Sequence, residues 1–252
     1  LVGVNMINSN LIGCGTFGTI IGYPDSTAGG VLKVSRIGRN YFLLKELSIL
    51  MHLQERQRQE STGGADNVIK LEGYGGKEMD FGGTMINMPC LHLSPQGMSP
   101  YNLSAESLTG LTGIIAKGLK LGLGYIHSHG IVHNDLSFQN FILVGRERAV
   151  IIDLGSAEPE NSCMDGIVGT ANFTHRDPLT KEKWTSLKQY DQASLAYVIR
   201  VVHNGGKIPW TPIEYPYKDY LAERDDSTRT WLQNTAFMED MKDYLLDGII
   251  FS

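Results

Sequence analysis

The stretch VHNDLSFQNFIL, residues Val132 to Leu143, decides how the rest of the chain is interpreted. It places His133, Asp135 and Asn140 between two apolar segments, and a simple buried strand needs none of them. A carboxylate here can accept the proton of a hydroxyl group, and the amide oxygen of Asn140, five residues later, can bind a divalent metal ion. The stretch therefore predicts a polar loop that carries chemistry.

A second acidic residue follows downstream, where the apolar run AVIID (149–153) ends in Asp153 before Leu154 and Gly155. One aspartate at the end of a strand is commonly a cap or turn residue. Here, however, two aspartates and one asparagine surround a predicted hairpin of FILV (141–144) and AVIID. The combination predicts a cluster of hard oxygen ligands.

The composition excludes several classes of protein. The chain has 252 residues and is 42% hydrophobic, which suffices for one large domain or two lobes. The formal net charge is −5 without a basic block, so no nucleic-acid partner is expected. Cys14, Cys90 and Cys163 form no CxxC motif, so neither a disulfide framework nor a zinc site is expected. This cysteine usage and the lack of an apolar run of ~18 residues favour an intracellular protein without a membrane partner.

A glycine cluster, GCGTFG (13–18), lies near the start of the chain. The GxGxxG pattern alone matches both dinucleotide-binding folds and loops that cover phosphates. The β-branched run TIIGYP (19–24) follows it in place of a helix, so we expect the glycines between two strands. There they would let backbone amides approach phosphate groups. A glycine-rich hairpin without a ligand is an equally good interpretation of this motif alone.

Two charged residues further along form a possible pair. Lys33 lies in the short apolar run VLKV, and Glu46 lies in KELSIL on a predicted helix. Taken singly, the lysine is best interpreted as a charge on an edge strand, and the glutamate as part of a solvated helix face. Taken together, a glutamate partner would hold a half-buried lysine in place while it contacts a phosphate.

Hydrophobic spacing predicts a β-rich first part and a mainly helical second part. Helices are expected over 41–59, 107–130, 191–205 and 228–251, with Gly130 as a C-cap. Strands are expected around the glycine cluster and at 31–34, 67–76, 82–91, 141–144 and 149–153. The stretch 92–102, with two prolines and a glycine, is expected to be a connector.

The order of these motifs is more specific than any one of them. A glycine loop, a strand lysine, a helix glutamate, H-x-D-L-x-x-x-N and D-x-G follow one another with compatible spacings. From Ile12 to about Trp210 the chain resembles the eukaryotic-type protein kinases. The resemblance implies an α+β, bilobal fold with an N-lobe over 1–90, a C-lobe over 91–252, and ATP between the lobes.

The resemblance also implies roles for individual residues, matched position by position. Asp135 resembles the catalytic base, Lys33 the lysine that binds the α- and β-phosphates, and Glu46 its helix partner. Asn140 and Asp153 resemble the ligands of Mg²⁺ (or Mn²⁺). The remaining positions that resemble ATP-binding residues are Ile12, Gly13, Gly15, Gly18, Ile20, Met88, Cys90, Leu91 and Ile142. In this alignment Met88 lies at the back of the adenine pocket and Pro89, Cys90 and Leu91 form the hinge.

Other positions fit the same family. Gly169-Thr170 resembles the GT of the substrate-binding segment and favours Ser or Thr in a protein as the substrate. Asp191 resembles the buried aspartate that braces the catalytic loop. The hydrophobic stack of the active form is matched by Leu50, His133 and Leu154.

The sequence departs from the family pattern at several positions. Asn134 replaces the arginine that meets a phosphate on the activation segment, so activity is not expected to need that phosphate. Ser137 and Gln139 stand where Ser/Thr and Tyr kinases, respectively, carry a cation, and a missing cation predicts a slow enzyme. His175-Arg176-Asp177 replaces Ala-Pro-Glu, and Asp177 is expected to pair with Arg229.

Two other functions remain open at this point. One is a pseudokinase, a nucleotide-binding or scaffold module with little catalysis. The other is a small-molecule phosphotransferase, whose members also carry the HxDLxxxN form. The sequence predicts neither the oligomeric state nor the identity of the substrate.

Overall fold

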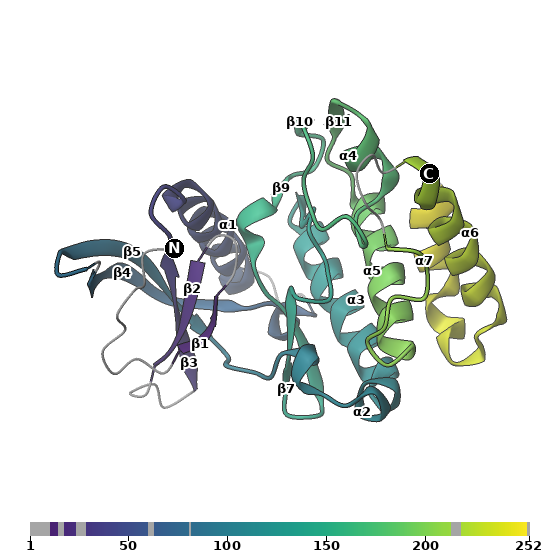
Figure 1. Ribbon diagram of the computed structural model, residues 1–252, viewed down its shortest axis with the longest axis horizontal. Coiled ribbons are helices and arrows are strands. Elements are labelled where there is room, and N and C mark those ends of the chain that lie inside the picture. The colour runs from purple at the N-terminus through teal and green to yellow at the C-terminus, as the bar shows by residue number, and fades with distance from the viewer. Residues whose placement is uncertain are drawn as a thin grey trace. The chain divides into compact units, whose positions relative to one another are not determined.

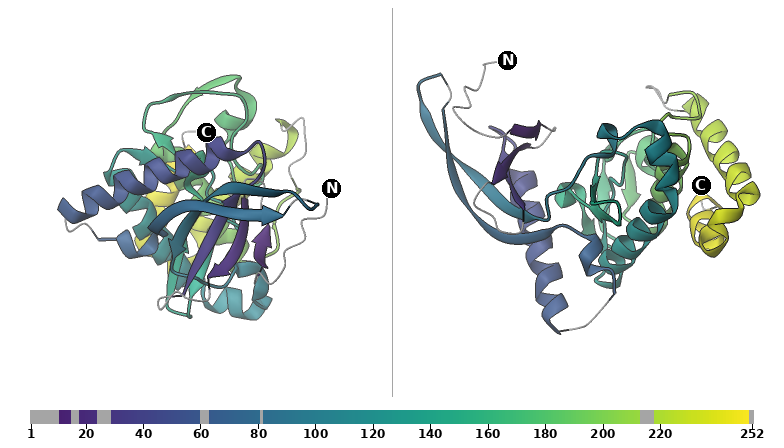
Figure 2. Two further views of the ribbon diagram at one scale, coloured as in Figure 1. Left: turned by 90° about the vertical axis from the view of Figure 1, so that its left-hand side faces the viewer. Right: turned by 90° about the horizontal axis from the view of Figure 1, so that it is seen from below.

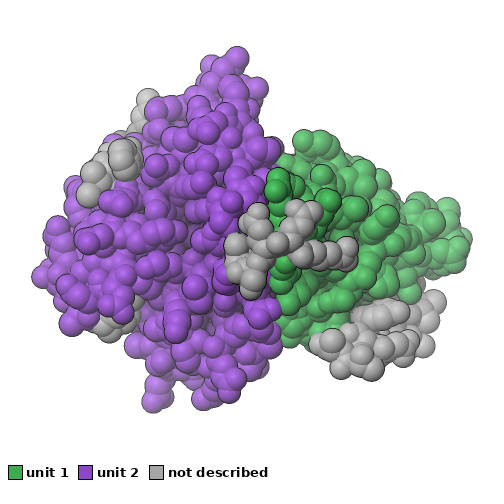
Figure 3. All heavy atoms as spheres, turned by 180° about the vertical axis from the view of Figure 1, so that it is seen from behind, with its two compact units in different colours: residues 1–61, 69–96, 153–155 green, residues 62–68, 97–152, 156–252 purple. Residues whose placement is uncertain are grey.

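The computed structural model describes residues 11–14, 18–23, 29–59, 63–80, 82–212 and 218–250. Figures 1 and 2 show the helices and strands, and Figure 3 colours the two compact units into which the chain divides. Unit 1 comprises residues 1–61, 69–96 and 153–155, and unit 2 comprises residues 62–68, 97–152 and 156–252. One unit is β-rich and the other mainly helical, which confirms the predicted α+β, kinase-like fold.

Unit 1 is an antiparallel five-stranded sheet with one long helix, α1 (Asn40–Gln59). The strand order is β1-β2-β3-β5-β4, with β1 (Leu11–Cys14), β2 (Gly18–Tyr23), β3 (Gly30–Ser35), β4 (Lys70–Asp80) and β5 (Met85–Ser94). Because β3 pairs with β5 only over Cys90–Leu93, the far part of the β4–β5 hairpin extends beyond the other strands (Figure 2). The helix predicted over 41–59 is confirmed, and it buries Leu43, Ile49, Leu50 and Leu53.

β5 corrects the sequence-based boundary between the two parts. It continues to Ser94, through residues predicted to be a connector, because Cys90–Leu93 pairs with β3 on one side and with β4 on the other. Leu91 and Leu93 are buried there. A boundary after Cys90 would cut this strand, and the structure instead divides the units after Gln96.

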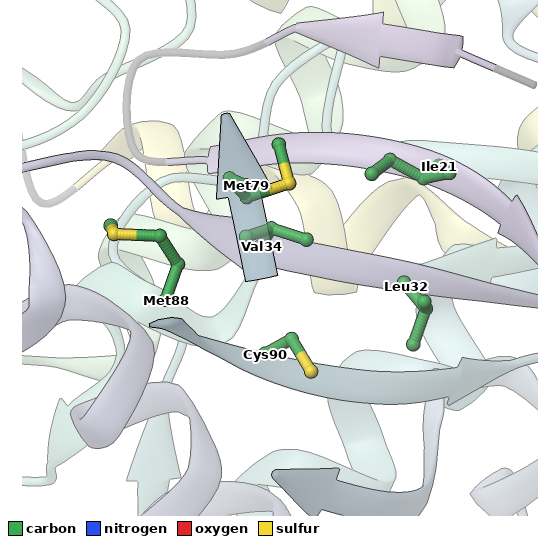
Figure 4. Close-up of a cluster of buried hydrophobic side chains, with 6 residues drawn as sticks. All are labelled: Ile21, Leu32, Val34, Met79, Met88 and Cys90. Atoms are coloured by element: carbon green, nitrogen blue, oxygen red, sulfur yellow. The ribbon is translucent and has the colours of Figure 1, made fainter. Parts of the chain in front are cut away.

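One face of the sheet carries a small hydrophobic cluster (Figure 4). Its side chains come from β2, β3, β4 and β5, and all are less than 10% exposed: Ile21, Leu32, Val34, Met79, Met88 and Cys90. Burying such side chains contributes roughly 1.5–3 kcal/mol each for the larger ones. The cluster fixes which residues of β3 and β5 face the other side of the sheet.

Unit 2 is built from helices and three two-stranded sheets. The helices are α2 (Ala105–Gly110), α3 (Thr112–Ser128), α4 (Arg176–Thr180), α5 (Lys188–His203), α6 (Lys218–Asn234) and α7 (Lys242–Ile250). The sheets pair β6 (Ile131–Val132) with β9 (Glu158–Pro159), β7 (Phe141–Val144) with β8 (Arg148–Ile151), and β10 (Cys163–Asp165) with β11 (Lys183–Thr185). Short 3-10 helices lie at Ala65–Asn67, Pro100–Asn102, Leu154–Ser156 and Ala236–Met241.

The helix predicted over 107–130 is two helices, because the chain turns at Leu111 between α2 and α3. Two of its glycines serve close packing. A Cβ at Gly118 would lie 3.0 Å from Ala149 Cβ, and one at Gly122 would lie 2.7 Å from the carbonyl oxygen of Asn67. The predicted C-cap glycine, Gly130, follows α3 with a φ of 70°, which glycine adopts without strain.

The C-terminal helix α7 crosses the most buried helix of unit 2, α5, at close range. A Cβ at Gly248 would lie 2.7 Å from Gln192 Cβ and 2.8 Å from the carbonyl oxygen of Gln189. Only a residue without a side chain permits this crossing. Among the described helices, none is long and apolar enough to cross a membrane.

The crossing gives a stability test. Replacing Gly248 by Ala inserts a methyl group against the backbone of α5, so we expect Gly248→Ala to lower the free energy of unfolding by roughly 1–3 kcal/mol. Gly124→Ala in α3 is the matched control, because a Cβ there meets nothing within 4 Å. It should stabilise the chain by up to about 1 kcal/mol through helix propensity. Denaturant unfolding of both variants measures the difference, and equal effects would contradict the close crossing.

Candidate functional site

A buried lysine in unit 1 is held by two carboxylates. Lys33 Nζ lies 2.6 Å from Glu46 Oε2 and 2.9 Å from Asp153 Oδ1. Lys33 and Glu46 are almost fully buried, while the side chain of Asp153 is 27% exposed. The backbone N–H of Leu154 also donates to Glu46 Oε1, at 3.4 Å. The pairing of Lys33 with Glu46, proposed from sequence, is therefore present.

The two carboxylates keep Lys33 charged. Burial alone would lower the pKa of the ammonium group, but the negative charges of Glu46 and Asp153 outweigh it and raise the pKa above its ordinary value. An ammonium group without such partners would lose its proton on burial. Lys33 is thus a fixed cation, suited to binding an anionic ligand such as a phosphate group.

The strand register places other predicted residues around this lysine. Ile20 pairs with Lys33, and Lys33 pairs with Leu91. Directly paired residues project to the same face of a sheet, so these three side chains share one face. A Cβ at Gly18 would lie 2.9 Å from the carbonyl oxygen of Val34, so a glycine is needed there.

The same register corrects the predicted adenine pocket and hinge. Cys90 pairs with Val34, the neighbour of Lys33, and Met88 lies two residues before Cys90. Both side chains therefore lie on the face opposite Lys33, in the cluster of Figure 4. Pro89, Cys90 and Leu91 lie inside β5, so they do not form a hinge.

The chain passes from one unit to the other inside the stretch 92–102, which was expected to be a connector, and not at Pro89, Cys90 and Leu91. The chain leaves β5 after Ser94, and the division between units falls between Gln96 and Gly97. The composition Ser-Pro-Gln-Gly over 94–97 was the available signal, since proline and glycine commonly end a strand. Gly97 lies against Ile142, a predicted adenine contact, with 3.0 Å between an ideal Cβ and Ile142 Cδ1.

The other predicted nucleotide-binding positions are partly described. Ile12 and Gly13 belong to β1, where Gly13 pairs with Ile20 and the side chain of Ile12 is 46% exposed. Gly15 lies outside the described residues. The roles of Ile12, Gly13, Gly18, Ile20, Leu91 and Ile142 in binding a nucleotide stay predictions.

The catalytic-loop stretch brings three predicted residues together in unit 2. Asn140 Nδ2 donates to the backbone carbonyl of Asp135 at 2.8 Å and to its Oδ2 at 3.1 Å. The hydroxyl of Thr170 donates to Asp135 Oδ1 at 2.9 Å. Both carboxylate oxygens of Asp135 therefore have a hydrogen-bond donor, which fixes the plane of the carboxylate.

Asp191 holds the loop that contains His133 and Asn134 through hydrogen bonds, as proposed from sequence. This carboxylate is 1% exposed and accepts from the backbone N–H groups of His133 (2.7 Å) and Asn134 (2.9 Å). His127 Nε2 lies 2.8 Å from its Oδ2. Asn134 has a φ of 62°, a conformation that asparagine tolerates better than most residues.

Asn134 fills the place of the expected arginine with a neutral, hydrogen-bonded group. It is buried, its Oδ1 accepts from the hydroxyl of Ser186 at 3.1 Å, and its Nδ2 donates to the carbonyl of Ser156 at 3.5 Å. Such a side chain offers no positive charge to a phosphate. The link to Ser186 ties the loop to the end of the segment 161–186.

That segment is held by backbone hydrogen bonds. β10 pairs with β11 in antiparallel register, from Cys163 opposite Thr185 to Asp165 opposite Lys183. The ladder continues at both ends: the N–H of Ser186 donates to the carbonyl of Ser162, and that of Gly166 to Glu182. These backbone hydrogen bonds hold the two ends of the segment together.

The expected pairing of Asp177 with Arg229 is wrong. Asp177 Oδ2 accepts instead from Lys181 Nζ at 2.7 Å and from the hydroxyl of Tyr190 at 2.9 Å. Arg229 pairs with Asp226 of its own helix at 2.7 Å. Lys181 and Asp226, each within about one helical turn of its partner, and Tyr190, 13 residues from Asp177, replace the expected pair.

The buried arginine of this region is Arg224, which sequence reasoning missed. It is fully buried, its Nε lies 2.9 Å from Asp225 Oδ1, and its Nη1 donates to the carbonyl of Thr174 at 2.7 Å. Its guanidinium lies 4.0 Å from the ring centroid of Tyr197. Nothing in the polar run ERDD distinguishes this arginine from a solvated one.

A divalent cation fits the donor set of the predicted residues. Within the described residues there is no group of three or more His, Cys, Asp and Glu side chains that would hold a metal unaided. Asp153 supplies a part-exposed carboxylate, and Asn140 directs its Nδ2 to Asp135, which leaves its Oδ1 as the donor atom. Carboxylate and amide oxygens are each of the kind that binds Mg²⁺ in proteins, and the roles of Asp153 and Asn140 as its ligands stay predictions.

Sequence comparisons find similarity to known protein kinases. No protein-family model matches the chain. The chain is 24% identical to mitogen-activated protein kinase 13 of Homo sapiens over 241 residues, which cover 92% of the chain and 61% of that protein. It is 30% identical over 88 residues to serine/threonine/tyrosine-protein kinase HT1 of Arabidopsis thaliana, covering 34% of the chain and 22% of that protein.

A third similarity is local. Over 56 residues the chain is 43% identical to the dual serine/threonine and tyrosine protein kinase of Gallus gallus, covering 22% of the chain and 6% of that protein. The chain therefore spans less than two thirds of the length of each of these relatives. Together with the fold described above, these similarities support the resemblance of the chain to the protein kinases.

His175 is a buried titratable group next to the substrate-binding segment. Burial is the main reason why its pKa is lowered to about 4. The positive charges of Arg224 and Arg176 lower the pKa further, and the negative charges of Asp177 and Asp225 oppose this shift. Its Nδ1 accepts from the N–H of Asp177, and its ring stacks on Tyr190 at 4.4 Å between centroids. The folded state therefore keeps His175 neutral.

This gives a prediction for stability against pH. The unfolded chain protonates His175 near pH 6.5, whereas the folded chain does so only near pH 4. Its contribution to stability is therefore complete above about pH 6.5 and is lost as the pH falls towards 4, by up to about 3 kcal/mol. His175→Asn keeps a capping side chain but cannot titrate, so its unfolding free energy should fall less over this range. His203→Gln is the control, and identical pH profiles for His175→Asn and wild type would contradict the prediction.

Proposed function

We propose that the chain is a protein kinase that transfers the γ-phosphate of Mg-ATP to Ser or Thr hydroxyls of protein substrates. The observation that carries the proposal is the carboxylate of Asp135, held at one oxygen by Asn140 and at the other by Thr170. Phosphoryl transfer depends mainly on positioning and charge, and a fixed base is the part that a substrate hydroxyl requires.

The chain's own residues take the following parts in this proposal. Asp135 orients the substrate hydroxyl and accepts its proton as the oxygen forms a bond to the γ-phosphorus and the bond to the β–γ bridging oxygen breaks. Lys33, kept charged by Glu46, binds phosphate oxygens. Asn140 and Asp153 would hold Mg²⁺, which when bound neutralises charge on the phosphates.

Ser or Thr is proposed as the acceptor because Thr170 follows Gly169 as in the Ser/Thr enzymes that the sequence resembles. Two of the relatives carry both serine/threonine and tyrosine in their names. Mapping of the phosphorylated residue is therefore part of the test. The proposal includes an intracellular location, where ATP is available and the described cysteines, all free, stay reduced.

The test is transfer of labelled γ-phosphate from Mg-ATP to general protein substrates and to the chain itself. Asp135→Asn should lower the rate by at least about 10²-fold, because the base is lost, while Mg-ATP still raises its melting temperature. Asp243→Asn, an exposed change on α7, is the control and should match wild type. Mass spectrometry of the product should find the label on Ser or Thr.

Other outcomes have definite meanings. ATP binding without transfer by the wild type would support the pseudokinase. Transfer to a small alcohol or sugar but not to proteins would support the small-molecule phosphotransferase. Label on Tyr alone would overturn the proposed acceptor.

A second prediction concerns activation. Because Asn134 is neutral and already bonded to Ser186, a phosphate on the segment held by β10 and β11 would meet no cation at position 134. We expect full activity from protein treated with a phosphatase. The measurement compares initial rates before and after treatment, with mass spectrometry to verify removal. A large increase in rate after incubation with an activating kinase would speak against it.

A further inference from the structure

The exposed side chain of Gln139 reaches the residue that contacts the proposed base. Its Nε2 lies 3.4 Å from the hydroxyl oxygen of Thr170, which itself lies 2.9 Å from Asp135 Oδ1. We propose that Gln139 is a positioning residue for Asp135, acting through Thr170. This inference rests on the proposed kinase function and goes beyond it, because it gives a role to a neutral amide at the position where Tyr kinases carry a cation.

Thr170 is fixed by its own backbone surroundings. Its carbonyl oxygen accepts from the N–H of Phe173 at 2.8 Å and from the hydroxyl of Thr174 at 2.9 Å. The preceding residue, Gly169, has a φ of 96°, and a Cβ there would lie 2.9 Å from the carbonyl oxygen of Asn134. The side chain of Thr170 is thus held beside the catalytic loop.

The chemistry of the amide decides the direction of the hydrogen bonds. The Nε2 group of Gln139 can only donate, so the oxygen of Thr170 accepts from it. The hydroxyl proton of Thr170 is then directed to Asp135 Oδ1. A carboxylate at position 139 would accept instead of donating, and it would compete with Asp135 for that proton.

No cation assists Asp135 from the neighbouring position. Ser137 stands where a lysine is common, and its hydroxyl is buried without a hydrogen-bond partner. Asn140 Nδ2 donates a hydrogen bond to the second carboxylate oxygen of Asp135, Oδ2. Asn140 directly and Gln139 through Thr170 are thus two neutral donors that act on the orientation of the base.

This arrangement predicts an effect on kcat and not on KM. Gln139→Leu removes the donor and should lower kcat roughly three- to tenfold, in line with the loss of one hydrogen bond, with the KM for ATP unchanged. Gln139→Glu should lower kcat further, because it reverses the hydrogen bond and adds a negative charge. Gln139→Lys restores a donor and should recover the wild-type kcat.

The experiment measures kcat and KM for these variants, for Thr170→Val, and for the double variant Gln139→Leu/Thr170→Val. If Gln139 acts through Thr170, Gln139→Leu should have no further effect in the Thr170→Val background. Gln233→Glu, an exposed glutamine on α6 of the same unit, is the matched control and should equal wild type. Because Gln139 is exposed, melting temperatures should be unchanged.

A measurement without nucleotide checks the contact itself. In the ¹⁵N spectrum of the unliganded chain, the side-chain amide signals of Gln139, identified by their loss in Gln139→Leu, should shift in Thr170→Val. They should not shift in Thr230→Val, an exposed threonine on α6. Unshifted signals would overturn the proposed contact.

The two proposals fail differently. An active wild type whose Gln139 variants all retain wild-type kcat, or whose effects simply add to that of Thr170→Val, overturns the role of Gln139 alone. A wild type that transfers no phosphate overturns both proposals.

Discussion

The carboxylate of Asp191 is the interaction on which the catalytic loop depends. Two backbone N–H groups and one imidazole bind it where water has no access, at His133, Asn134 and His127. A buried carboxylate without such donors would be strongly unfavourable, so the charge and the loop conformation stabilise each other. The positive φ of Asn134 is maintained because its backbone N–H donates to Asp191 and its side-chain oxygen accepts from the hydroxyl of Ser186.

The two units differ in the partners of their charged side chains. In unit 1 charged groups contact one another, because Lys33 lies between the carboxylates of Glu46 and Asp153. In unit 2, the neutral side chains of Asn140 and Thr170 donate hydrogen bonds to the carboxylate of Asp135. Fixed dipoles need no rearrangement when charge moves, so a neutral surrounding does not exclude catalysis. It does remove one source of attraction for a phosphate, which agrees with the slow rate expected from sequence.

The sequence predicted best what depends on short spacings. The pairing of Lys33 with Glu46, the common loop of Asp135 and Asn140, and helices α1 and α5 follow from residue order and periodicity. The single helix expected over 228–251 is instead the end of α6, a 3-10 helix and α7. The strand register of β5 did not follow from residue order, because pairing between β3 and β5 joins residues nearly sixty positions apart. The sequence-based interpretation therefore assigned Met88 and Cys90 to the nucleotide site, although their side chains lie on the face of the sheet opposite Lys33.

Other features had no local signal. The burial of Arg224 depends on Tyr197 and on carbonyls fifty residues away. The β10–β11 ladder pairs two short polar stretches without the alternation that marks a strand. The contact of Gln139 with Thr170 needs the turn at Gly169 to bring two loops together, and only the folded chain reveals it.

The crossing of α5 by α7 affects the order in which the chain becomes functional. Gly248 lies against residues 189–193, the turn of α5 that carries Asp191. During synthesis the catalytic loop is therefore complete long before the helix that supports its anchor has left the ribosome. Until residues 242–250 emerge, α5 lacks this cover, and the loop gains its final rigidity only as α7 packs. The loop thus depends, through Asp191, on packing by a helix that comes much later in the sequence.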